Sequence, residues 1–378
     1  MMSPSLSVAR MEPERTNPRI SRGQVIALFA FDVGFEVSFE ELDRLLTSRP
    51  LPPLSQKKQT PPYLQYSKPP RTMNLGQIDP LFTAPGNIRA MMFDFGVASI
   101  AYHWIIGADT ASLPLQQLPQ VAQDLYNRNL EMDARSRARQ LMETIRPAIT
   151  RPELSALVED YYLFIIEELD QPWPSEDLLA KHGSTLAQVL RFEVQPLSQE
   201  QQEEALAQRM AYYQDDLVLV DWNAAIIYDR DSWDAANVLE LLNVELLEAR
   251  YIDAELDRRI TEYQRLMQKP IKWALPFQTP YRKTMQELAE LRIESLVLAK
   301  RVENALKLIG DLYLARLHNA ATARFYLPDW EAAISRKLDI IANFYQITND
   351  RVRTAQSHIL ELVVIALIFL EILLAILK

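Results

Sequence analysis

The sequence predicts an α+β protein with an N-terminal α+β domain, a stalk of long helices in an antiparallel bundle or coiled coil, and one C-terminal transmembrane helix. Three observations predict this class. β-branched and aromatic runs alternate with amphipathic segments over residues 24–230. Apolar residues then keep a helical spacing over residues 231–358. Residues 359–377 are apolar with few interruptions.

The composition fits a folded chain and excludes several kinds of site. The 378 residues carry a net charge of −10, which disfavours direct nucleic-acid binding because phosphate backbones are repelled. The absence of cysteine excludes disulfides, thiol nucleophiles, iron–sulfur clusters and zinc fingers. Eight glycines are few for this length, so glycine-rich phosphate loops are scarce, and we expect no cofactor. Residues 1–23 lack the apolar run of a secretory signal and predict a disordered tail.

The first domain begins with a strand over residues 25–31, VIALFAF, because β-branched and aromatic residues dominate this run. Ser38 and Glu41 then form a capping box that opens a short helix. Residues 47–72 contain seven prolines and predict a long extended loop. We interpret this loop as a spacer in preference to a recognition motif for a partner protein.

The remainder of the first domain mixes strands and helices. Gly96 divides two apolar runs between residues 88 and 104, which predicts a strand pair or one bulged strand. Beyond it, the pattern predicts helices over residues 115–144, 178–190 and 199–212, a strand over 161–169, and a strand, turn and strand over 217–229.

The stalk begins at Ser232 with a helix that the prolines from Pro270 onward interrupt. A second helix is expected over residues 284–326 and should end at Pro328. The third helix carries a coiled-coil seam, whose apolar positions alternate steps of four and three. These positions include Ile334, Leu338, Ile341, Tyr345 and Val352. The seam packs either against the second helix or against another subunit, and it predicts a rigid stalk in a homo-oligomer.

Residues 359–377 predict a single transmembrane helix, a tail anchor, since at 1.5 Å per residue they are roughly 28 Å long and match the hydrocarbon core. Arg351 and Arg353 precede them, which favours a cytoplasmic body on a bacterial inner membrane. The alternative is a buried terminal helix of a soluble core. Glu361 and Glu371 lie within the span, where they snorkel or contact a neighbouring helix, or serve ion or proton transport.

The motifs of common enzyme classes do not occur in the sequence, which has no GxxxxGK(S/T), GxGxxG, GxSxG or HExxH. The four histidines are scattered without metal-ligand spacing. The catalytic candidates are aspartates: Asp94 in the FDFG segment, and Asp215, Asp221 and Asp229 with their neighbours Asp216 and Asp231. Paired carboxylates can hold a divalent ion or transfer protons. Aspartates at turns and strand ends more often face water or bond to the backbone, so a structural role is favoured.

Three segments of the chain resemble one family. Residues 93–97, FDFGV, resemble the F-D-Y-G-V-V-V segment of the "required for meiotic nuclear division" family. Residues 309–317, IGDLYLARL, are similar to its I-G-E-L-F-x-L-R segment, and residues 337–374 resemble its C-terminal helix. The chain departs from the pattern at Leu362, where tryptophan is usual, and over residues 235–248, which replace a segment with Ser-His.

The resemblance implies a membrane-anchored protein of a family without an assigned enzymatic activity, of which this chain is a divergent, bacterial member. Eukaryotic relatives sit in the mitochondrial inner membrane, form large homo-oligomers and support mitochondrial translation. The resemblance therefore implies self-association and, more remotely, a link to translation at a membrane.

These observations favour a membrane-anchored, self-associating scaffold or tether over an enzyme. The stalk would assemble the subunits and present the α+β domain to a cytoplasmic partner protein. Two alternatives stay open. One is an ion channel or transporter subunit with a stalk like that of CorA-type magnesium channels. The other is a membrane-tethered, metal-dependent hydrolase that uses the aspartates between Asp215 and Asp231.

Overall fold

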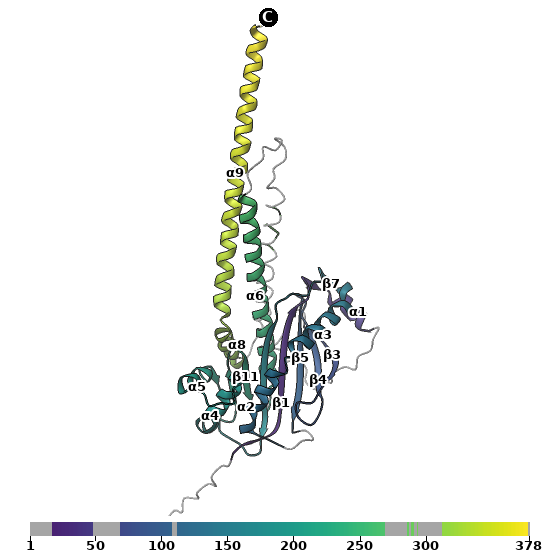
Figure 1. Cartoon of the computed structure of the whole chain (residues 1–378), viewed down its shortest axis with the longest axis vertical. Coiled ribbons are helices and arrows are strands. Elements are labelled where there is room, and N and C mark those ends of the chain that lie inside the picture. Colours follow the sequence, from purple (N-terminus) through teal and green to yellow (C-terminus); the bar gives the residue numbers. More distant parts are fainter. Residues whose placement is uncertain are drawn as a thin grey trace, which may run out of the picture.

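The computed structural model describes residues 17–47, 69–107, 112–268 and 312–376, together with residues 286, 289, 290 and 293. Within these residues the chain folds into a mixed α+β body from which two long helices rise (Figure 1). This confirms the α+β class. The body is built on a nine-stranded sheet whose two faces are both covered by helices.

The sheet is mostly antiparallel, and only β8 and β11 run parallel among the described neighbours. Its order is β3 (Arg71–Ile78), β4 (Gly86–Met92), β5 (Val97–Ile106), β1 (Arg19–Asp32), β8 (Glu159–Leu169), β11 (Ala224–Tyr228), β10 (Leu217–Val220) and β9 (Arg209–Met210). β6 (Leu113–Pro114) pairs with the start of β1. A separate pair joins β2 (Glu36–Val37) to β7 (Ile149–Thr150).

Helices lie on both sides of this sheet because its central strands are apolar on both faces. The first face is covered by α2 (Leu118–Asn127), α3 (Glu131–Thr144) and α4 (Ser175–Arg191). The second is covered by α6 (Trp233–Gln268) and α8 (Leu312–Arg324). The remaining helices are α1 (Phe39–Thr47), η1 (Leu115–Gln117), η2 (Arg146–Ala148), α5 (Gln199–Ala205) and α9 (Leu327–Ile376).

Several expected elements are confirmed. The first apolar run forms the central strand β1, which is longer than expected at both ends. The Glu41 amide donates to the Ser38 hydroxyl at 3.4 Å, as the capping box predicts. The FDFG segment turns between β4 and β5, so the strand pair is the correct alternative. Gly96 has a φ of 92° there, and a Cβ at this position would collide with the carbonyl oxygen of Gly34.

Other expected elements are wrong or incomplete. The helix expected over 199–212 ends at Ala205, because residues 209–210 pair with β10 as β9. The helix expected over 115–144 is two helices, separated near Asn129, which has a φ of 49°. The strand β3 begins inside the expected proline-rich loop, most of which lies outside the described residues.

The long helices α6 and α9 run parallel to each other and both lead away from the body (Figure 1). Near the body, Phe325, just before α9, packs on Tyr161 of β8 with ring centroids 5.0 Å apart. Farther out, Lys337 pairs with Asp253 at 2.6 Å and with Asp257 at 2.7 Å. In an antiparallel bundle of three successive helices the first and third run in the same direction, so the course of α6 and α9 agrees with the expected stalk. Most of the expected second helix, residues 284–326, lies outside the described residues.

The break before α9 is where the sequence placed it, but its cause differs. α8 ends at Arg324, and Tyr326 adopts a φ of 55°. Pro328 is the second residue of α9, where the missing amide hydrogen costs nothing because first-turn amides have no intrahelical partner. Pro328 thus begins a helix instead of ending one. In the part of the chain that the structure describes, no helix was found that is long and apolar enough to cross a membrane.

Candidate functional site

α6 buries a set of polar side chains where it crosses the sheet. Glu240, Asn243, Glu245 and Glu248 are each 4% exposed or less. Most of the other residues in this segment, residues 235–249, are apolar and pack into two core clusters. Buried carboxyl groups are costly unless they are paired or protonated, so each of these groups calls for a physical explanation.

Glu240 is paired. Its carboxylate forms an ion pair with Arg89 of β4 and accepts a hydrogen bond of 2.7 Å from the Ser99 hydroxyl of β5. Arg89 also donates from Nε to Nε2 of His103 at 2.9 Å. Burial and the neighbouring Arg89 charge hold the pKa of His103 well below its ordinary value, so the ring is neutral and can accept this bond. An ion pair and hydrogen bonds thus join the first turns of α6 to β4 and β5, and each buried polar group in this network has a partner.

The middle of the α6 contact is centred on Glu159, at the start of β8. The side-chain amide of Asn243 donates to the Glu159 backbone oxygen at 3.2 Å. Two helical turns farther on, Arg250 forms an ion pair with the Glu159 carboxylate. Because residues 243 and 250 lie two turns apart on one helix face, both reach the same strand residue.

Between Asn243 and Arg250 on α6, Glu248 is buried, and so is Asp32, the last residue of β1. Neither carboxylate oxygen of Glu248 has a hydrogen-bond partner among the described residues. Burial raises the pKa of Asp32 to about 8, the Gly34 amide opposes this, and the Glu153 charge adds to it. Burial and the Asp32 charge hold the pKa of Glu248 well above its ordinary value. Among the described residues, none of the groups that shift these two pKa values is a cation.

Glu245, three residues before Glu248 on α6, approaches His318 of α8. Its carboxylate lies 3.9 Å from Nε2 of His318. Burial raises the pKa of Glu245 to about 7, although His318 opposes the shift. α6 therefore carries two buried carboxyl groups, Glu245 and Glu248, whose pKa values burial raises.

The comparisons identify the domain beneath α6. Residues 22–235 match the family described as "Uncharacterized protein MJ0711, N-terminal domain". The chain belongs to this family. It is also similar to an uncharacterized protein of Methanocaldococcus jannaschii, with 26% identity over 261 residues, which cover 68% of this chain and 78% of the relative. No solved structure matches the chain.

The MJ0711 domain thus contains the sheet apart from the first three residues of β1, and the match ends within the first turn of α6. Arg89, Ser99 and Glu159 belong to the domain, whereas their partners on α6 lie beyond it. The buried polar groups therefore form the junction between the MJ0711 domain and the stalk.

The sequence analysis did not single out these α6 residues. A signal was present, because Glu240, Asn243 and Glu248 stand within a stretch where nearly all other residues are apolar. A helix that is apolar on all sides is buried, so its polar positions must be buried too. That inference needs no structure, although the partners of these groups do.

The aspartates singled out from the sequence divide into two places. Asp215, Asp216, Asp229 and Asp231 gather at the open end of the β10–β11 hairpin, where their charges and burial raise the pKa of Asp229. The Asp216 carboxylate accepts hydrogen bonds from the backbone amides of Tyr212 and Tyr213 at 2.7 Å and 3.0 Å, and Asp229 accepts one from the Asp231 amide at 2.9 Å. These are the backbone bonds expected of aspartates at turns.

Asp221 lies at the other end of the hairpin and is fully buried. Its carboxylate pairs with Arg191 of α4 at 2.7 Å and with Arg324 of α8, whose Nε donates at 2.7 Å. Asp221 thus has one arginine partner within the MJ0711 domain, Arg191, and one from α8 beyond it, Arg324. Across the described residues, no group of three or more histidine, aspartate or glutamate side chains was found that could hold a metal ion.

Asp94 lies half-buried in the β4–β5 turn, and its backbone oxygen accepts a hydrogen bond of 2.8 Å from the Val37 amide. In the stalk, Ile334 and Ile341 are buried in one cluster with Ile252 and Leu256 of α6, and Leu338 packs against that cluster. This part of the seam packs inside the chain. Glu361 is exposed on α9, whereas the side chains of Tyr345, Val352, His358 and Glu371 lie outside the described ones.

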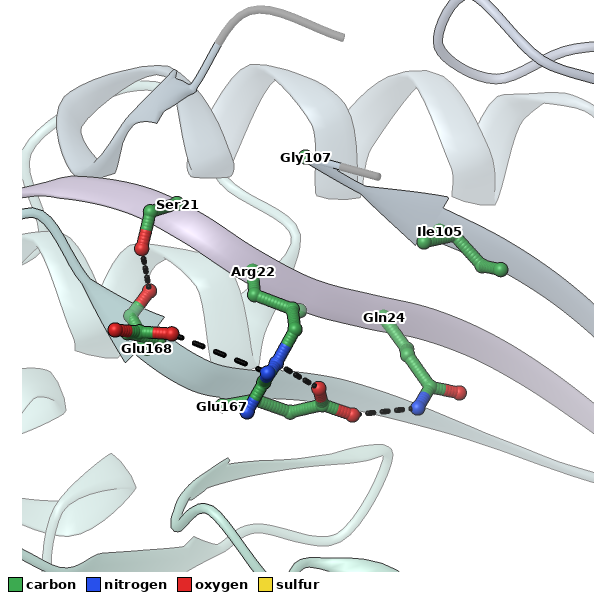
Figure 2. Close-up of a pocket in the computed structure, with 8 residues that line it drawn as sticks. Ser21, Arg22, Gln24, Ile105, Gly107, Glu167 and Glu168 are labelled. Carbon is green, nitrogen blue, oxygen red and sulfur yellow. Dashed lines mark hydrogen bonds and ion pairs between the residues drawn. The ribbon is translucent and has the colours of Figure 1, made fainter. Parts of the chain in front are cut away.

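A shallow pocket opens at the edge of the MJ0711 domain where β1, β5 and β8 lie side by side (Figure 2). It is lined by Ser21, Arg22, Gly23, Gln24, Ile105, Gly107, Glu167 and Glu168. Arg22 and Gln24 reach Glu167 at 2.8 Å and 2.7 Å, so the main polar groups of the pocket satisfy one another. Few polar side chains of the pocket are therefore available to bind a ligand.

Proposed function

We propose that this protein is a membrane-anchored scaffold, in which α9 enters the membrane and carries the MJ0711 domain at its other end. One observation carries the proposal. Residues 363–370 are all exposed, and their seven large apolar side chains are between 48% and 66% exposed. Successive helical residues point in directions about 100° apart, so eight of them present apolar surface around the whole helix.

Apolar surface around the full circumference fits a hydrocarbon environment. A single partner helix covers only one stripe, and water is an unfavourable solvent for a continuous apolar patch of this kind. The full length of the span, residues 359–377, rests on the sequence, because several of its side chains lie outside the described ones. Arg351 and Arg353 precede the span and support a cytoplasmic body, on a bacterial inner membrane.

The geometry of α9 suits a spacer. Its 50 residues form one helix, whose first part packs against α6 and whose end stands clear of the other described elements (Figure 1). Since Ile334 and Ile341 are already buried within the chain, self-association has to use other surfaces. The apolar end of α9 is such a surface, and the α9 helices of neighbouring copies can pack together there within the membrane.

Flotation of the full-length protein with liposomes tests the anchor. The wild-type protein is expected to rise with the lipid, whereas the double variant Ile365→Arg, Phe369→Arg should stay at the bottom of the gradient, because two charges on the apolar end oppose insertion. Ile347→Arg is the matched control, since Ile347 is also exposed on α9 but precedes the span. Flotation of the double variant to the same extent as the control would contradict the anchor.

The resemblance to the meiotic nuclear division family supports a narrower proposal, that the scaffold serves translation at the membrane. Association with ribosomes tests it. Solubilised membranes that contain the protein should yield it in the ribosome pellet at low salt. Its absence from that pellet, with the protein still in the membrane fraction, would remove the link to translation and leave the scaffold in place.

A further inference from the structure

The packed side of α9 carries a charged residue between apolar ones. Trp330, Lys337 and Phe344 are spaced seven residues apart, so they lie along one side of the helix. Trp330 and Phe344 pack against the core cluster that α9 shares with α6. Lys337 stands between them, and its side chain is only 19% exposed. An ammonium group at such a position costs stability unless an opposite charge meets it.

α6 carries a charged residue at the matching place. Leu246 and Ile260 pack against the same cluster, and Asp253 lies midway between them with a side chain that is 17% exposed. The Lys337 ammonium lies 2.6 Å from the Asp253 carboxylate and 2.7 Å from the Asp257 carboxylate. It also donates a hydrogen bond of 3.2 Å to the Asp253 backbone oxygen. The charged position on each helix is therefore placed against the charged position on the other.

This pairing depends on how α9 lies along α6. One heptad nearer the start of α6, Lys337 would face Leu246 and Arg250. One heptad nearer its end, Lys337 would face Ile260 and Gln264. Neither place offers a carboxylate, and the first brings two positive charges together. Lys337 thus fixes the register of the two helices, as single polar residues in coiled-coil seams do.

A second copy of the chain is a poor partner for the same side of α9. Two chains anchored in one bilayer insert α9 in the same direction, and a symmetric pair of α9 helices brings like positions together. The two Lys337 side chains would then face each other in a packed interface, where like charges repel. The apolar residues of the α9 seam, Ile334, Leu338 and Ile341, would not by themselves distinguish α6 from another apolar seam.

We propose that Lys337 and Asp253 select the partner of the α9 seam: they direct it to α6 of the same chain and exclude the α9 seam of a second copy. The inference rests on the proposed membrane anchor, which makes the α9 helices of neighbouring copies parallel, and it narrows the self-association of the proposed scaffold. Copies then meet through the apolar end of α9, beyond the contact with α6, while each MJ0711 domain keeps a stalk of its own.

Disulfide cross-linking of the full-length protein in lipid vesicles tests the exclusion of a second copy. Leu338→Cys places a reporter in the α9 seam of a chain without native cysteine, and two such cysteines meet only across a pair of α9 helices. Mild oxidation of Leu338→Cys should give little cross-linked dimer. Added Lys337→Leu should raise the dimer yield about tenfold or more, because the repulsion between copies is gone and Asp253 has lost its partner. Arg336→Leu, the same change at an exposed neighbouring position, should leave the yield unchanged.

An exchange of charges tests the attraction to α6. Lys337→Glu brings three acidic side chains together and should lower the melting temperature of the detergent-solubilised protein. It should not raise the dimer yield of Leu338→Cys, since like charges would still face each other in a pair of α9 helices. Added Asp253→Lys restores opposite charges and should recover most of the lost melting temperature.

Three outcomes would overturn the partner selection: the same dimer yield with and without Lys337→Leu, an equal rise in yield with Arg336→Leu, or no recovery of the melting temperature when the charges are exchanged. Flotation with liposomes reports on the anchor separately. A protein that floats but gives one of these outcomes keeps the anchor and loses the partner selection. A protein that does not float loses the anchor, and with it the parallel copies on which the exclusion depends.

Discussion

Asp221 is a residue on which three separate elements converge. It lies in the β10–β11 turn and holds Arg191 of α4 and Arg324 of α8, and Glu204 of α5 contacts both arginines at 3.3 Å. Removal of one partner from a buried ion-pair network leaves the other charges unpaired in a medium that solvates them poorly. The residue therefore matters to stability whether or not it has any other role.

Asp221→Ala is expected to lower the free energy of unfolding by about 3–5 kcal/mol, since two arginines lose their shared partner. Urea unfolding measures this change. Asp215→Ala, at an exposed position of the same hairpin, is the control and should change stability by about 0.5 kcal/mol or less. Equal effects of the two substitutions would show that the buried network contributes nothing.

Glu245 makes stability depend on pH in a definite direction. Its pKa in the folded protein is about 7, against an ordinary value of 4.5, so between these values the folded state holds a proton that the unfolded state has lost. The contribution of this group to stability is therefore greatest below pH 4.5, falls by about 1.4 kcal/mol per pH unit up to about pH 7, and is constant above it.

Glu245→Gln should remove this slope and make the protein more stable than the wild type at pH 8, since the amide has no proton to lose. Free energies of unfolding from urea titrations at pH 5, 6, 7 and 8 measure it, with Glu262→Gln as the exposed control. A wild-type slope in Glu245→Gln, or a loss of stability at pH 8, would contradict the assignment.

At the scale of elements, the packing of α9 on α6 depends on a few buried positions. Ile341 is 2% exposed and Ile340, its neighbour, is 43% exposed. Ile341→Asp should lower the free energy of unfolding by several kcal/mol because it buries an unpaired charge, and it should separate α9 from α6, whereas Ile340→Asp should have little effect. Thermal unfolding compares the two. Similar melting temperatures for both variants would show that this part of the seam is not a packed interface.

Elements with a strong local signal could be predicted from the sequence. The strands β1, β8, β10 and β11 are rich in aliphatic and aromatic residues, and α6 begins at Trp233, directly after Ser232, where the helical pattern starts. The short strand β9 could not be predicted, because its two residues owe their conformation to pairing with β10 and continue a helical pattern in sequence.

Most of the candidate site could not be predicted from the sequence, because its residues are brought together by the fold. The aspartates of the β10–β11 hairpin are close in sequence, but Asp221 and Asp229 lie at opposite ends of the hairpin because the chain reverses between them. Arg89 and Glu240 are far apart in sequence and meet only because α6 packs across the sheet. The spacing of these residues along the sequence predicts neither arrangement.

At the scale of the whole molecule, the structure joins a sheet domain to a long helix through α6. The domain belongs to a family found in an archaeal relative, and α9 carries apolar side chains around its end. The parallel course of α6 and α9 could not be derived from the seam, since a seam fixes which side of a helix is buried and not the direction of its partner. Because α6 and α9 run in the same direction, the domain lies at the opposite end of α9 from its C-terminal apolar residues.

The most direct test of the membrane anchor is the accessibility of single cysteines, which the absence of native cysteine makes clean. Ile347→Cys, Ile365→Cys and Phe369→Cys would each be placed in the full-length protein in lipid vesicles and treated with a charged maleimide. The account predicts that Ile347→Cys reacts, whereas Ile365→Cys and Phe369→Cys react only after detergent dissolves the bilayer. Equal reaction of all three cysteines in intact vesicles would show that the end of α9 lies in water and would contradict the membrane anchor.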